Sequence, residues 1–92
     1  LHMHPELGFR EYDTAKYIAG YLKNLGFEVI EDVAKTGVIG ILRGSEGRRS
    51  VAVRSEMDCL QVTEHTGAEY SSKIPGLMHA CGHDGHMAIL LG

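Results

Sequence analysis

The sequence lacks the features that mark several specialised classes of protein. Two cysteines, Cys59 and Cys81, do not make the disulfide framework of a small secreted domain, although a single bridge between them is possible. No stretch approaches the roughly 18 consecutive apolar residues of a membrane-spanning helix, and no secretory signal opens the chain. A formal net charge of -3 offers no excess positive charge for nucleic acid or an anionic membrane. We therefore expect a cytoplasmic protein that binds neither nucleic acid nor membrane.

Histidine, by contrast, is abundant and unevenly placed. The chain has 92 residues and six histidines, four of which lie between His65 and His86. Histidine is the commonest metal ligand and the usual acid–base side chain near neutral pH, so the crowding points to a chemical site. The sequence opens without a methionine and stops at Gly92, within an apolar run. We expect the 92 residues to be part of something longer.

The first half of the chain has clear periodicity. Residues 11–25 carry apolar side chains at helical spacing and are followed by Gly26, which suits a helix C-cap. Asp13 or Thr14 is expected to cap the start of this helix. Residues 27–33 and 36–42 are each predicted to form a strand. This part of the sequence indicates an α/β fold.

The second half is less regular. Residues 50–54 form a short apolar run, which predicts a strand buried on both faces. Residues 55–80 have no sustained periodicity, and long connections of this kind inside a domain are usually functional. A helix is predicted to begin within residues 82–85 and to continue through Leu91.

The most informative segment lies where that connection meets the helix. Its sequence is His79-Ala80-Cys81-Gly82-His83-Asp84-Gly85-His86. Cys81 and His83 are two positions apart, close enough to bind one ion or two adjacent ions. A structural zinc site normally has four protein ligands, and only one half-site is present here. The segment therefore favours an open catalytic metal site.

A second candidate group follows the run at residues 50–54. It is Arg54-Ser55-Glu56-Met57-Asp58, at the point where α/β sheets place their ligand sites. Asp58 can hydrogen-bond a metal-bound imidazole, or it can ligate a metal directly. The residues alone leave both alternatives open.

These segments resemble the M20 metallopeptidase family, in particular its amidohydrolase branch of hippurate hydrolases, N-acyl-amino-acid amidohydrolases and auxin-conjugate hydrolases. The resemblance rests on His2-Met3-His4-Pro5-Glu6-Leu7-Gly8-Phe9, Thr36-Gly37-Val38, Arg54-Ser55-Glu56-Met57-Asp58 and Met78-His79-Ala80-Cys81-Gly82-His83-Asp84-Gly85-His86. It implies that Cys81 and His83 are metal ligands, with His83 approaching both ions of a two-metal centre. It further implies that Asp58 supports this centre. The family's general-base glutamate and its remaining ligands lie beyond this stretch.

The resemblance also implies a fold and a reaction. Residues 1–92 would be the N-terminal portion of a three-layer α/β/α zinc-peptidase-like catalytic domain with a mixed sheet, without the downstream catalytic segments and the lid domain. The full-length protein would be a homodimer that hydrolyses amide bonds of N-acyl amino acids or small peptides. It would use two divalent ions, which can be zinc, manganese, cobalt or nickel. The 92 residues alone are expected to be inactive and to leave apolar faces uncovered.

Two departures from the family pattern concern the loop that carries Asp58. Glu56 replaces a shorter aspartate, and Gln61 replaces a proline. Two other functions stay open. One is a catalytically incomplete metal-binding module or degenerate homologue. The other is an enzyme with Cys81 as nucleophile, activated by His83 or His86.

For the remaining polar residues, structural roles are expected. Cys59 is predicted to be a buried, inert side chain. The other residues considered are His2 and His4 as structural groups, Glu64 and His65 as a solvated surface, His86 as a structural or supporting group, Asp84 as a helix cap or catalytic group, and His79 as a packing or site-lining group.

Overall fold

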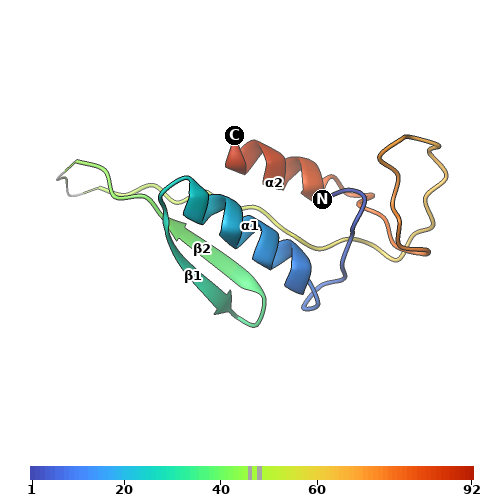
Figure 1. Ribbon diagram of the computed structural model, residues 1–92, viewed down its shortest axis with the longest axis horizontal. Helices are drawn as coiled ribbons and strands as arrows, with labels where there is room; N and C mark the ends of the chain where they lie inside the picture. The colour runs from blue at the N-terminus through green and yellow to red at the C-terminus, as the bar shows by residue number, and fades with distance from the viewer. Residues whose placement is uncertain (46, 48) are drawn as a thin grey trace.

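The chain forms two helices and a β-hairpin joined to a long irregular segment (Figure 1). The computed structural model describes residues 1–45, 47 and 49–92. The elements are α1 (Tyr12–Asn24), β1 (Glu28–Val33), β2 (Gly37–Ile41) and α2 (His83–Leu91), and β1 and β2 pair antiparallel. All four lie within a residue or two of the ranges that the sequence predicts. The α/β prediction is therefore confirmed for these elements.

Helix α1 is defined at both ends by hydrogen bonds. At its C-terminus the N–H of Gly26, whose φ is 84°, donates to the carbonyl of Lys23, and the N–H of Phe27 donates to the carbonyl of Leu22. These two bonds make a Schellman cap, as Gly26 predicts. At the N-terminus the expected cap by Asp13 or Thr14 is wrong. Instead the upstream Glu6 carboxylate accepts hydrogen bonds from both backbone N–H groups and from the Thr14 hydroxyl.

A small apolar core lies where α1 packs on the hairpin and on α2. Its buried members are Ile18, Leu22 and Met87, the last from α2. Partly buried apolar residues surround them, namely Leu1, Phe27, Val29, Val38, Met57 and Leu91. Gly40 in β2 allows this packing to be close, because a Cβ there would lie 3.0 Å from Leu22 Cδ1 and 3.1 Å from Phe27 Cδ1. The core therefore ties α2 to the first half of the chain.

The predicted strand at residues 50–54 is not formed. These residues have no assigned strand, and Val51 and Val53 are 90% and 74% exposed. A strand buried on both faces needs a neighbour to pair with, and none of the described residues pairs with this run. It passes as an extended trace from the hairpin towards the base of α2 (Figure 1).

The molecule is elongated and leaves apolar surface open. Its principal extents are 49 × 24 × 21 Å, and its radius of gyration is 14.6 Å, against roughly 12 Å for a compact domain of this length. Ile89 on α2 is 79% exposed. The expectation of uncovered apolar faces is confirmed. Neither of the helices in the described part of the chain is long and apolar enough to cross a membrane.

Candidate metal site

The two segments singled out in the sequence meet at the first turn of α2. His83, the first residue of α2, lies with its Nδ1 atom 2.9 Å from the Asp58 carbonyl oxygen and 3.0 Å from Asp58 Oδ1. The ring is largely buried, while the carboxylate is partly exposed. The His83 side chain therefore joins two segments that lie 25 positions apart in the sequence, and both were expected to contribute to the site.

These contacts determine which nitrogen of His83 is available. A backbone carbonyl only accepts hydrogen bonds, so Nδ1 must carry the proton and donate it to Asp58. In the neutral ring Nε2 then keeps its lone pair, which is the atom that a metal ion would use. A carboxylate or carbonyl behind a metal-ligating imidazole is the usual way in which proteins orient such a ligand. The donor set at His83 therefore fits a metal ion.

A second pair of side chains lies beside this one. His86 Nδ1 lies 3.2 Å from Glu56 Oε2, and the rings of His83 and His86 are 5.8 Å apart. The hydrogen bond from His86 lowers the pKa of Glu56. One ligand atom each from Glu56, His83 and His86 falls within 4.8 Å of the other two, a spacing that can hold a metal ion.

The sequence contained signals for this convergence. His86 lies three residues after His83 in a helix, so the two share a face. Glu56 lies two residues before Asp58, and alternate residues of an extended segment point to the same side. Glu56, which stands where the family has an aspartate, is thus one of the three residues that converge. The structural or supporting role expected for His86 stays a prediction, because its ring also lies where it could ligate an ion.

Cys81 lies just ahead of the helix and does not join that group of three. Its side chain is exposed and its thiol is free, as is that of Cys59. Gly82, between Cys81 and His83, has a φ of 86° and marks the turn into α2. Ligation by Cys81 and His83 stays a prediction, as does the supporting role of Asp58.

The N-terminal segment holds Asp58 in place through its neighbour Cys59. The Cys59 N–H donates to the Glu6 carbonyl at 2.8 Å, and Leu7 and Cys59 form a parallel bridge. The Cys59 side chain is buried, as predicted, and this burial raises the pKa of its thiol. The same Glu6 residue caps α1. The segment that resembles the family's His-Pro-Glu motif therefore positions both a helix and the site.

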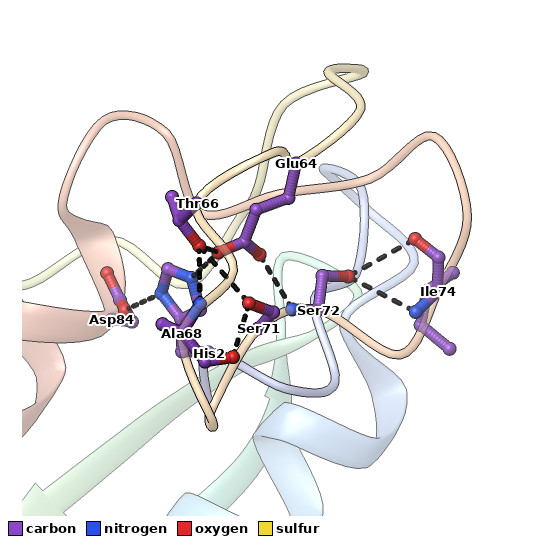
Figure 2. A network of polar contacts seen from close by, with 8 residues as sticks. All are labelled: His2, Glu64, Thr66, Ala68, Ser71, Ser72, Ile74 and Asp84. Atoms are coloured by element: carbon purple, nitrogen blue, oxygen red, sulfur yellow. Dashed lines mark hydrogen bonds and ion pairs between the residues drawn. The ribbon is translucent and has the colours of Figure 1, made fainter.

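A polar network joins the other side of α2 to two distant segments (Figure 2). His2 lies between Asp84 and Glu64, with Nδ1 2.6 Å from Asp84 Oδ2 and Nε2 3.3 Å from Glu64 Oε1. The hydrogen bond to Asp84 is the main cause that raises the pKa of His2. Hydrogen bonds from the Ser72 N–H and the Thr66 hydroxyl lower the pKa of Glu64 to about 2.

Several expectations for these polar residues can now be assessed. His2 is structural, as expected, and His65 is exposed as predicted. The solvated surface predicted for Glu64 is wrong, because its side chain is only 4% exposed and its oxygens are occupied by hydrogen bonds. His79 is also buried, at 4% exposure, and neither of its ring nitrogens has a hydrogen-bond partner within the described residues. Burial lowers the pKa of His79.

Comparison with known proteins shows which family these segments match. The family model described as Peptidase family M20/M25/M40 matches residues 52–92, which include Asp58, Cys81 and His83. Thermostable carboxypeptidase 1 of Saccharolobus solfataricus is 50% identical over the whole chain. The N-acyl-L-amino acid amidohydrolase of Geobacillus stearothermophilus is 47% identical, also over the whole chain. The chain spans 24% and 25% of these two relatives.

A solved structure extends the match to three dimensions. The Bacillus subtilis YXEP protein, described as a dinuclear metal binding peptidase from the M20 family, superimposes with a TM-score of 0.93 at 41% identity. The match covers 99% of this chain and 26% of that protein. The predicted fold, a fragment of a larger α/β fold, is thereby confirmed. The chain belongs to the M20 peptidase family.

Proposed function

We propose that the protein carrying this chain is a metal-dependent hydrolase of amide bonds in N-acyl amino acids or small peptides. The observation that carries the proposal is the bond from His83 Nδ1 to Asp58, because it reserves Nε2 for a metal ion. The names of the Geobacillus amidohydrolase and the Saccharolobus carboxypeptidase support the two substrate classes. Since the chain spans about a quarter of these relatives, the activity is assigned to the whole protein.

Within this chain, Cys81 and His83 would hold the metal centre. Divalent ions in such a site lower the pKa of water and polarise a carbonyl oxygen. The description of the Bacillus neighbour as dinuclear supports two ions. Asp58 orients the His83 ring, and the thiol of Cys81 stands at the entrance to α2. A thiolate favours zinc, although imidazoles and carboxylates also accept manganese, cobalt or nickel.

The rest of the proposal concerns the whole protein. Residues 1–92 would form the first portion of the catalytic domain, followed by segments that supply the general base and the other ligands. The homodimer and the cytoplasmic location stay predictions. Small N-acyl amino acids or short peptides would be the partners, with neither nucleic acid nor membrane among them.

Metal analysis of the whole protein, joined to a hydrolysis screen on N-acyl amino acids, tests the proposal. We expect bound divalent ions, amide cleavage, loss of cleavage after chelation and recovery when the ion is returned. Full cleavage by the metal-free protein would overturn the proposal. Inhibition by a chelator that leaves the thiols unalkylated separates it from a mechanism in which Cys81 is the nucleophile, because a thiol nucleophile does not need an ion.

Metal binding without hydrolysis is the second candidate. It is favoured by the convergence of Glu56, His83 and His86, which brings three potential ligand atoms within 4.8 Å of one another inside this chain. The same experiment separates the two functions: bound metal with no turnover on any N-acyl amino acid or short peptide would support the binding module.

A further inference from the structure

The first turn of α2 is held from two sides by side chains from distant parts of the chain. His83 donates to Asp58 on one side, and the next residue, Asp84, accepts a 2.6 Å hydrogen bond from His2 on the other. Successive residues of a helix point about 100° apart around the axis. Two bonds in different directions fix both the position of this turn and its rotation about the helix axis.

The turn needs this support because its own backbone is weakly constrained. Gly82, with φ 86°, precedes it, and Gly85 lies within it, with nothing within 4 Å of a Cβ at either position. Glycine leaves the backbone freer than any other residue. No side chain of the N-cap residue closes the start of α2 by a hydrogen bond. The direction in which His83 points therefore depends on contacts from outside the helix.

His2 is itself anchored, so it can act as a fixed support. Its second nitrogen faces Glu64, whose side chain is 4% exposed and accepts from the Ser72 N–H at 2.6 Å (Figure 2). The N–H of Lys73 donates to the carbonyl of Met3 at 2.9 Å, which ties the N-terminal segment to the same loop. Figure 2 shows the His2 ring between the two carboxylates.

We propose that His2 is a positioning residue for the metal site, which acts by holding Asp84 and thereby aiming the adjacent His83. The inference rests on the proposed function, because it assigns His83 as a ligand. It assigns a role in the site to His2, which lies 81 positions before His83 in the sequence. The Nδ1 contact to Asp84 carries the effect, and the Nε2 contact to Glu64 keeps the ring in place.

Two substitutions distinguish the contribution of His2 Nδ1 from that of His2 Nε2. Asparagine places an amide N–H close to the position of Nδ1, whereas glutamine places it close to that of Nε2. The whole protein is studied as wild type, His2→Asn, His2→Gln and His2→Ala, with His4→Asn as the control, because His4 is exposed in the same segment. The zinc dissociation constant is measured by competition with a chromogenic chelator, and kcat and KM are measured separately.

We expect His2→Gln and His2→Ala to weaken zinc binding roughly tenfold, the low end for groups that orient a ligand. His2→Asn is expected to stay within about threefold of wild type, and His4→Asn to match wild type. Equal affinity of the asparagine and glutamine variants, or wild-type affinity of His2→Ala, would overturn the inference while leaving the proposed function intact. If His2→Ala does not fold, which thermal melting reports, the comparison of asparagine with glutamine still decides. A wild-type protein that binds no zinc would overturn both.

Discussion

Two different kinds of interaction stabilise the two halves of the molecule: apolar packing in one and directional polar bonds in the other. Helix α1 and the hairpin pack through apolar side chains around Leu22, and the two strands of the hairpin pair with each other directly across a short turn. The start of α2 is instead held by polar bonds from Asp58 and His2, which are 25 and 82 positions from their partners. Packing of the first kind tolerates substitution of similar volume, whereas directional bonds do not. The comparison suggests which changes should affect stability and which should affect the site.

The largest effect is expected from removal of a proposed ligand. His83→Ala or Cys81→Ala in the whole protein should lower both zinc affinity and amide hydrolysis by more than the roughly 100-fold seen for groups that merely orient a ligand. The packing of α1 should be unaffected, so the metal-free proteins should melt like wild type. The control is His65→Ala, because His65 is an exposed histidine in the long connection that precedes the site. Turnover at the wild-type level in either variant would contradict the metal site.

On the packed side, Leu22→Ala should destabilise the fold without a direct effect on the site. Leu22 is 7% exposed and touches the core from α1. Loss of a buried leucine side chain costs about 2–5 kcal/mol, whereas Leu42→Ala, at a position 65% exposed, should cost under about 0.5 kcal/mol. Denaturant unfolding measures both. An equal loss of unfolding free energy in the two variants would contradict the role of apolar packing in this half of the molecule.

A smaller effect is expected when the orienting bond is weakened. Asp58→Ala removes the Oδ1 acceptor of His83 but leaves the carbonyl contact. We expect a loss of about tenfold in zinc affinity. Asp58→Asn keeps an acceptor oxygen and should lose less. Calorimetric zinc titration of both variants checks this order, and equal losses would mean that the charge of Asp58 matters more than the position of its acceptor oxygen.

The smallest effect concerns acid stability. The folded pKa of Glu64 is lowered from 4.5 to about 2, so its contribution is fully present above pH 4.5 and is lost as the pH falls towards 2. Glu64→Gln should therefore flatten the fall in unfolding free energy across this window. Glu69→Gln, exposed in the same loop, should not. Identical pH profiles for the two variants would argue against a structural role for the Glu64 carboxylate.

The packed half was predictable because its signals are local. Helical spacing gave α1 within one residue at each end, and Gly26 forms the cap that its position indicates. Alternating apolar residues gave β1 and β2. The prediction of a strand at residues 50–54 was wrong because a strand depends on neighbours that are distant in sequence. An apolar run becomes a buried strand only beside neighbouring strands, and no described residue pairs with it.

The polar half was predicted only where the residue pattern or the resemblance pointed to particular residues. Asp58 and His83 do meet, but no pattern in the sequence indicates that Glu6 would cap α1 or that His2 would bridge Asp84 and Glu64. Each of these contacts depends on which later segments pack against the N-terminal segment in the folded chain. Spacing along the sequence carries information about such contacts only when a known fold is available as a guide.

The contrasting burial of the two thiols has a practical consequence. Cys81 is open to solvent beside the proposed ion site, whereas Cys59 is enclosed and has a raised pKa. Since thiolates are the species that react with maleimides and other alkylating probes, labelling within this stretch should be confined to Cys81. Protection from such a probe would then report occupancy of the site directly, with no substrate and no turnover required.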